Sequence, residues 1–333
     1  FEYRYRILVC VTILQALMNP IASLVLIRIN GGTAMMRILG IVGVQICICV
    51  PIIVFQFCKG KEFFSKEYWG YALRIGIPIV PHYLSGIILN QGDRIMIDKM
   101  VGKTEVALYG LAYSIGMLVQ LFISGMNSAL TPWMYSKIKK GDIRSMRKVL
   151  QLLSIVVVGI AVALMLISPE MVLIFGSPKY CEAVYVIPPV AASVFFIFIY
   201  NILSMPQFYY EKTQFLMAAS MAAAGANVVL NFIFIRLFGY IAAGYTTLAC
   251  YMLYSVGHYI VSKQILVNEG IQENLMNPGF LLACSVFLIG ASIICNLIFP
   301  YRILRYAILL ASAGLVFWKK ELLLKTMADI RKK

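Results

Sequence analysis

The chain has 333 residues, of which 61% are hydrophobic and 13% are charged, and its formal net charge is +15. Soluble domains average about 45–50% apolar and about 25% charged residues, so this composition excludes a water-soluble fold. The basic charge could indicate nucleic acid, but Lys and Arg occur in short clusters between apolar runs. Such clusters are typical of membrane topology signals and of contacts with anionic lipid, so we predict no nucleic-acid partner.

Ten apolar runs follow one another, each close to the length of about 20 residues that a membrane crossing needs. Backbone groups in lipid must be satisfied within a span, so continuous apolar runs predict helices, whereas a barrel would show alternation. The predicted fold is all-α and polytopic, with a six-helix bundle and flanking helix pairs. The predicted spans are residues 7–27, 36–57, 71–91, 106–130, 149–167, 184–205, 215–235, 240–261, 280–298 and 303–318.

Two polar joints divide these spans into two, six and two. Residues 59–70 and 263–278 are predicted to be cytoplasmic linkers. The segment 71–262 between them is the expected six-helix bundle. Residues 1–58 are read as two helices that end an incomplete first bundle, and residues 279–333 as two terminal helices with a basic tail.

The distribution of positive charge predicts the orientation. Twenty of the 29 Lys and Arg residues lie at the chain ends and in alternate loops, and nine lie in the remaining loops. Positive residues gather on the cytoplasmic side, so both termini are predicted to be cytoplasmic. The chain begins with Phe1, and no small-residue cleavage site follows, so we expect a truncated amino-terminal end rather than a signal peptide.

Side chains that carry enzyme or metal chemistry are scarce. The eight cysteines form no C-x-x-C pair and mostly lie in apolar runs, and only two histidines are present. The 14 acidic residues are expected at span edges or in loops, and only Asp93 and Asp98 come near a membrane helix in an internal setting. No carboxylate is expected mid-membrane for proton or cation chemistry. We therefore predict no catalytic residue, no metal and no cofactor.

The third span, residues 71–91, carries the most informative polar residues. At about 100° per residue, one helix stripe holds Arg74, Pro78, Pro81, His82, Ser85 and Gly92. Prolines bend a helix, and a bent helix with a polar stripe suits the wall of a water-filled cavity. The alternative is that Arg74 reaches the inner membrane interface and His82 bonds to a neighbouring helix.

Two further sets of polar residues have an i,i+4 spacing. Arg94 and Asp98 are predicted to form a structural ion pair, or Arg94 faces a cavity and binds an anionic headgroup through its planar fork. Asn227 and Asn231 are expected to hydrogen-bond across packed helices, with a polar cavity face as the alternative.

Two segments of the chain match longer patterns. Residues 93–114 read DRIMIDKMVGKTEVALYGLAYS, and residues 227–248 read NVVLNFIFIRLFGYIAAGYTTL. They resemble the patterns DRIMIG…G…VG.Y..AY and N..LN...IP.YG..GAA.AT of the bacterial polysaccharide (O-antigen-type) exporters. That group belongs to the multidrug/oligosaccharidyl-lipid/polysaccharide flippase superfamily.

The resemblance implies two pseudo-symmetric six-helix bundles in the bacterial plasma (inner) membrane, with residues 71–262 as the second bundle and about four helices missing before the first. The implied substrate is a polyprenyl-pyrophosphate-linked oligosaccharide of O-antigen, lipopolysaccharide or capsule synthesis. It would be moved by alternating access, with no bond made or broken. Anionic membrane lipid, a polysaccharide polymerase and assembly proteins are the implied partners.

The polar stripe motivates the hypothesis about binding residues. Arg74 and Arg94 are expected to contact pyrophosphate or sugar, and four more residues are expected to line the cleft: His82, Ser85, Asn90 and Gln91.

Three alternatives stay open. A drug/cation antiporter of the same superfamily would usually need a membrane-buried carboxylate, and none is predicted mid-span. A membrane polysaccharide polymerase would need a large outer loop, and residues 168–183 are too few for one. An assembly scaffold is distinguished from a flippase only by a leaflet-exchange assay.

Overall fold

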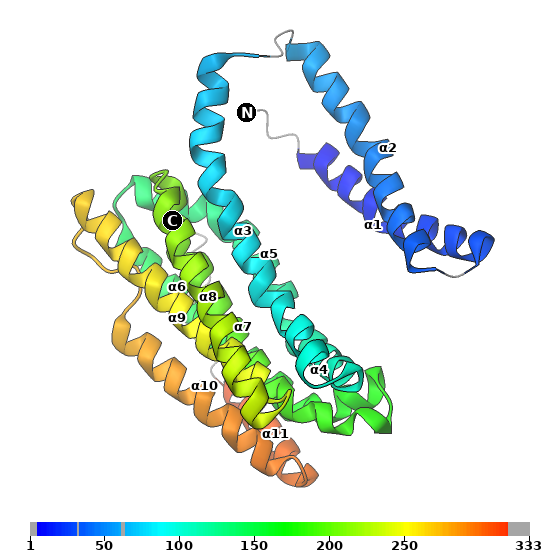
Figure 1. The fold of residues 1–333 in the computed structure, drawn as a ribbon. Coiled ribbons are helices and arrows are strands. Elements are labelled where there is room, and N and C mark those ends of the chain that lie inside the picture. The colour runs from blue at the N-terminus through cyan, green and yellow to red at the C-terminus, as the bar shows by residue number, and fades with distance from the viewer. Residues whose placement is uncertain (1–4, 32, 61–63, 319–333) are drawn as a thin grey trace. The chain divides into compact units, whose positions relative to one another are not determined.

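The computed structural model describes residues 5–31, 33–60 and 64–318, and every regular element in these ranges is a helix (Figure 1). The all-α prediction is therefore confirmed. The predicted basic tail at 319–333 and part of the 59–70 linker lie outside the described residues. The elements are α1 (Tyr5–Asn30), α2 (Ala34–Gly60), α3 (Lys66–Met100), α4 (Lys103–Gly116), α5 (Val119–Lys139), α6 (Ile143–Phe175), the 3-10 helix η1 (Pro178–Val186), α7 (Ile187–Tyr209), α8 (Thr213–Phe238), α9 (Ala242–Asn268), α10 (Pro278–Ile298) and α11 (Arg302–Trp318).

Within the described residues, seven helices are long and apolar enough to cross a membrane. The helices α4 and α5 form an eighth candidate that is bent by 43°. The multi-pass prediction is confirmed, but the count is lower than the ten predicted spans. The difference arises at α11, which has only 17 residues, and at α9, which has several polar residues on its buried face.

One predicted span is wrong in its shape. Residues 106–130 were expected to form a single helix, but the chain breaks at Met117 and Leu118, between α4 and α5. The third helix is longer than the predicted span 71–91, because α3 continues to Met100.

The chain divides into two compact units, residues 1–73 and residues 74–333. In the first unit, α1 and α2 pack against each other. A Cβ added at Gly40 would lie 2.6 Å from the Cα of Ser23, so only glycine allows this close approach. The boundary between the units lies inside α3, a few residues after the predicted linker 59–70.

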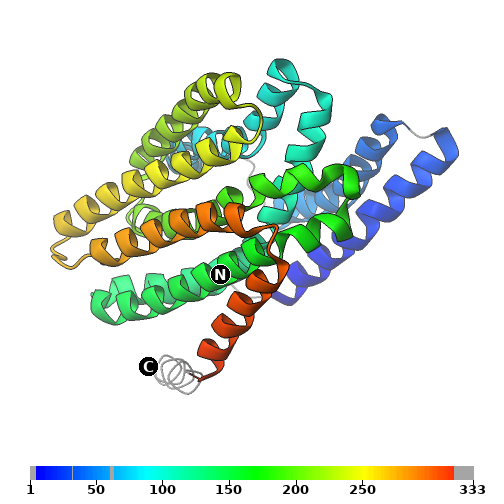
Figure 2. The same ribbon diagram turned by 90° about the horizontal axis from the view of Figure 1, so that it is seen from below.

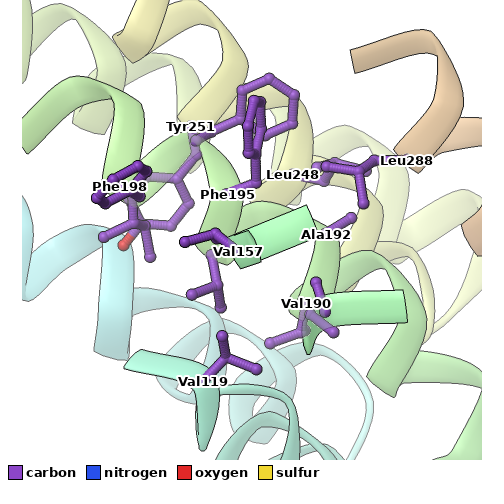
Figure 3. Close-up of a cluster of buried hydrophobic side chains, with 14 of the residues drawn as sticks. Val119, Val157, Val190, Ala192, Phe195, Phe198, Leu248, Tyr251 and Leu288 are labelled. Atoms are coloured by element: carbon purple, nitrogen blue, oxygen red, sulfur yellow. The ribbon is translucent and has the colours of Figure 1, made fainter. Parts of the chain in front are cut away.

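The centre of the second unit is α7, which packs against α5, α6, α9 and α10. Its sequence is apolar on all sides, which is typical of a fully buried helix. Figure 3 shows Phe195 and Phe198 of α7 among side chains from α5, α6, α9 and α10. The terminal helix α10 lies against α6 and α7 and contributes Leu288 to this core.

The helix α3 is attached to the second unit differently. It runs as one 35-residue helix through Pro78 and Pro81, and it makes few close backbone contacts with other helices. Long polar side chains connect it to the bundle instead. Each proline removes one backbone donor, so α3 bends most easily near these residues.

The last helix, α11, turns away from α10 (Figure 2) and is held to α6 by an ion pair. Arg305 donates two parallel hydrogen bonds of 2.8 Å to the carboxylate of Glu170 and one of 2.6 Å to the carbonyl of Leu166. The Arg305 side chain is only 3% exposed, so its charge depends on this partner.

We predict that Glu170→Gln lowers the free energy of unfolding by about 2 kcal/mol, because the buried guanidinium of Arg305 loses its counter-charge. The matched control is Glu182→Gln, at an exposed glutamate of η1. Thermal unfolding of the purified protein in detergent, followed by circular dichroism, measures both variants. Equal midpoints for the two variants would contradict the prediction.

Candidate functional site

A cavity of about 610 Å³ opens in the second unit between α3, α4 and α7. Its wall combines one cation, several aromatic rings and neutral polar groups. The lining residues are Tyr83, Gly86, Ile87, Asn90, Gln91, Arg94, Tyr113, Ser114, Met117 and Tyr200. Three of the predicted cleft residues, Asn90, Gln91 and Arg94, therefore lie together on its α3 side.

Among the described residues, Arg94 is the only charged one that lines this cavity. Its Nη1 donates to Oε1 of Gln91 at 2.8 Å, and its guanidinium carbon lies 5.2 Å from the ring centroid of Tyr113. The Nε of Arg94 is buried and has no partner in the described part of the chain. Since an unpaired buried donor is costly, this atom is available for an anionic ligand.

The predicted ion pair between Arg94 and Asp98 does not form among the described residues. Arg94 bonds to Gln91, on the preceding turn, and is placed over the ring of Tyr113. Asp98 is exposed at the end of α3. The i,i+4 spacing allows the pair, but the guanidinium instead has the hydrogen bond to Gln91 and the cation–π contact with Tyr113.

Asn90 connects the cavity wall to two neighbouring helices. Its Oδ1 accepts hydrogen bonds from the hydroxyls of Tyr113 on α4 (2.7 Å) and Tyr251 on α9 (3.2 Å). Its Nδ2 donates to the carbonyl of Gly86. The wall is therefore held in place by hydrogen bonds that fix the ring of Tyr113, and the ring of Tyr200 stacks on that of Tyr251.

The carboxylate of Asp93 is fully buried next to this cavity, on a different face of α3 from Arg94. It accepts three hydrogen bonds, each from a different helix: Tyr109 on α4 (2.5 Å), Asn231 on α8 (2.6 Å) and Thr247 on α9 (2.7 Å). The expectation that every acidic residue lies at a span edge or in a loop is therefore wrong for Asp93. It failed because α3 extends nine residues beyond the predicted span, from Gln91 to Met100.

Asn227 and Asn231 are fully buried on α8. Asn231 donates to Asp93 and to Oδ1 of Asn227 (3.1 Å), and it accepts from the hydroxyl of Thr246 on α9. These bonds connect α8 to α3 and α9, and neither asparagine lines the cavity.

The other predicted site residues lie further away. His82 is half-buried beside the cavity and lies 3.0 Å from the hydroxyl of Tyr254. Ser85 is buried and donates to the carbonyl of Pro81. Arg74 is exposed, and twenty residues of helix separate it from Arg94, roughly 30 Å along the axis.

The sequence analysis missed the aromatic part of the wall, which comprises Tyr83, Tyr113 and Tyr200, and it missed the partners of Asp93. A signal was present in the spacing. Tyr109 and Tyr113 on α4, like Thr247 and Tyr251 on α9, are i,i+4 pairs of polar groups within apolar spans. Among the described residues, no group of three or more His, Cys, Asp or Glu side chains could hold a metal ion.

Two protein families match this region of the chain. Residues 3–139 match the family described as polysaccharide biosynthesis protein, and residues 78–233 match the MatE family. The second match includes all of the α3 cavity residues from Tyr83 to Arg94 and the α8 asparagines.

Two relatives from Haemophilus influenzae are similar to the chain. A protein of the Lsg locus is 28% identical over 172 residues, which cover 48% of this chain and 41% of the relative. An uncharacterised membrane protein is 29% identical over 167 residues, which cover 47% of this chain and 40% of the relative. The chain thus spans less than half the length of these curated relatives. No solved structure matches it.

We predict that Asp93→Asn lowers the free energy of unfolding by about 2 kcal/mol, because an amide group cannot accept all three hydrogen bonds. Asp98→Asn removes a carboxylate from the exposed end of the same helix and should change stability by less than about 0.5 kcal/mol. Unfolding midpoints in detergent check both values. A stability loss at Asp98 as large as that at Asp93 would argue against the network.

Proposed function

We propose that this chain belongs to the multidrug/oligosaccharidyl-lipid/polysaccharide exporter superfamily and is part of a flippase for polyprenyl-pyrophosphate-linked sugar units. The chain is a multi-pass membrane protein, and both matched families point to transport rather than catalysis. The observation that carries the proposal is the tyrosine-lined cavity, in which Arg94 is the one charged side chain of the described residues.

A flippase solves a problem of solvation. The sugar–pyrophosphate headgroup cannot cross hydrocarbon, because each polar group left without a partner there costs several kcal/mol, on the order of 2–7. A hydrated cavity in the protein wall replaces the lost water contacts. The polyprenyl tail is itself apolar and remains in the membrane throughout.

The groups around the cavity fit the two parts of such a headgroup. The free Nε of Arg94 and its planar fork suit a pyrophosphate, and the carbonyl and amide groups of Asn90 and Gln91 suit sugar hydroxyls. Tyr83 is 65% exposed, and its ring offers an apolar face on which a sugar ring can lie.

The remaining predicted residues have separate places in this proposal. His82 and Ser85 adjoin the cavity and support its α3 wall. Arg74, roughly 30 Å from Arg94 along α3, would meet the pyrophosphate at the cytoplasmic end of the path rather than in the same bound state. Anionic lipid would contact the basic junction of α5 and α6, where Lys139 ends α5, Lys140 follows it and Arg144 lies in the first turn of α6.

Alternating access would proceed through α3. Its attachment by side chains and its two prolines make it the helix of the second unit that moves at the lowest cost. We place the protein in the bacterial inner membrane with both termini in the cytoplasm, from the charge distribution. A polymerase and assembly proteins would take up the exported unit.

We predict that Arg94→Ala slows leaflet exchange of a fluorescent polyprenyl-pyrophosphate oligosaccharide by about tenfold or more, because a charge-assisted contact is lost. The assay uses proteoliposomes with the whole protein that contains this chain. Arg94→Lys should recover only part of the rate, because it keeps the charge but not the fork. The matched control is Arg236→Ala, an exposed arginine that lies over the ring of Phe232 on α8.

Equal exchange rates in Arg94→Ala and Arg236→Ala would contradict the proposal that Arg94 binds the headgroup. Absence of exchange in the wild-type protein would favour an assembly scaffold instead.

A second candidate function, a drug/cation antiporter, is favoured by one observation. Such a transporter needs a membrane-buried carboxylate, and Asp93 is one. Efflux of a cationic dye from vesicles, driven by a sodium or proton gradient and abolished by Asp93→Asn but not by Asp98→Asn, would support this candidate over the flippase.

A further inference from the structure

One face of α5 is polar, although α4 and α5 together form a candidate membrane span. At about 100° per residue, five side chains with hydroxyl or amide groups lie within an arc about 100° wide. We call these residues the α5 row: Gln120, Ser124, Asn127, Ser128 and Thr131. The row extends roughly 16 Å along the helix axis.

The α5 row is not the face by which α5 packs on the bundle. The helix packs against α6 and α7, and its buried side chains are mostly apolar, for example Ile123 and Met134. Ser124 and Ser128 are exposed, and the other three members of the row are partly exposed. Polar groups placed against lipid would lose their water without gaining a partner. An exposed row of them therefore indicates a surface that faces water or a polar ligand.

The α5 row adjoins the cavity. Met117, at the break between α4 and α5, lines the cavity, and Gln120 begins the row three residues later. The row also borders α7, because Oγ1 of Thr131 lies 3.7 Å from Sδ of Met205. The same helix supplies Tyr200 to the cavity wall. A ligand with its charged end at the cavity could therefore extend along the row.

The groups of the α5 row can still bond to a ligand. The hydroxyls of Ser124, Ser128 and Thr131 each donate to a backbone carbonyl of α5, at 2.9, 3.0 and 2.7 Å, so their oxygens remain acceptors. The side-chain carbonyl oxygens of Gln120 and Asn127 are buried and have no partner among the described residues. Each of these amides carries both donors and an acceptor, as sugar hydroxyls do.

The α5 row is also uncharged. No Lys, Arg, Asp or Glu occurs between residues 117 and 136. In the adjoining cavity, Arg94 is the one charged lining residue of the described part of the chain, and in the proposed function it binds the pyrophosphate. A carboxylate on the sugar chain would lie beside hydroxyls and amides with no counter-charge, which is costly once part of its water is removed.

We propose, on the basis of the flippase function proposed above, that the α5 row binds the sugar chain while Arg94 holds the pyrophosphate, and that the row selects uncharged sugars. Its neutral groups offer hydrogen bonds to hydroxyls along the helix, and none of them compensates a negative charge. The substrate class is thus a polyprenyl-pyrophosphate-linked oligosaccharide of neutral sugars.

Leaflet exchange of two matched substrates tests the selectivity. Two fluorescent polyprenyl-pyrophosphate trisaccharides differ only in one sugar, which is glucose in the first and glucuronic acid in the second. In proteoliposomes with the whole protein that contains this chain, we expect the neutral substrate to cross at least about tenfold faster. Ser128→Lys places a cation in the row and should lower this ratio by about threefold or more.

Removal of hydroxyls tests the binding. The double variant Ser124→Ala/Ser128→Ala removes two exposed acceptors and should slow exchange of the neutral substrate by about fivefold. The matched control is Ser312→Ala, at an exposed serine of α11 whose hydroxyl also donates to its own helix, at 2.7 Å to the carbonyl of Leu309. The control should keep the wild-type rate, and the unfolding midpoints of both variants in detergent should equal that of the wild type.

Equal rates for the two substrates in a protein that exchanges both would overturn the selectivity and retain the flippase. An unchanged neutral rate in the double variant would overturn the sugar-binding role of the row. A slower rate together with a lower unfolding midpoint would overturn it as well, because the row would then bond to another helix of the whole protein. Absence of exchange for both substrates would reject the proposed function itself.

Discussion

The arrangement of the second unit depends on the hydrogen bonds that Asp93 accepts. The carboxylate lies on α3 and is bonded to α4, α8 and α9 at once, through Tyr109, Asn231 and Thr247. In lipid, the tails are as apolar as the side chains, so apolar contact alone does little to select one position of a helix, and polar bonds do so instead. Since α3 makes few close backbone contacts, these bonds decide where it lies and therefore where the cavity wall lies.

This kind of attachment suits a moving part. The core around α7 is held by interlocking apolar side chains, which resist any gradual displacement. Hydrogen bonds between side chains can instead be exchanged one at a time, for example when Asn90 gives up one of the two phenols that donate to it. The rigid core and the adjustable helix thus use different interactions, and the cavity lies where they meet.

The sequence was sufficient for the class of fold and for much of the cavity wall on α3. Continuous apolar runs predict membrane helices because lipid imposes that pattern. Three of the residues proposed from the sequence for the cleft, Asn90, Gln91 and Arg94, lie on the α3 wall of the cavity, although none of them belongs to the predicted polar stripe. The sequence could not give the break between α4 and α5, because no proline or charge marks Met117. It also could not give the ring of phenols, because a tyrosine in an apolar span reads equally well as a residue that faces lipid.

The prediction that Arg94 pairs with Asp98 was wrong for a related reason. Spacing along one helix shows which partners are possible, but the choice among them depends on other helices, here on the ring of Tyr113. The full burial of Asp93 could not be predicted from the sequence either, because its partners come from three segments distant in the sequence.

Asp93 and Arg94 are consecutive residues of α3. One turn of the helix therefore contains both the carboxylate that bonds it to its neighbours and the cation that faces the cavity. Successive side chains on a helix diverge by about 100°, and this angle fixes how the two are aimed relative to each other. Any substitution that weakens the hydrogen bonds of Asp93 also redirects the guanidinium of Arg94. The position of α3 and the direction of the cation in the cavity wall are therefore coupled, and a substitution that changes one changes the other.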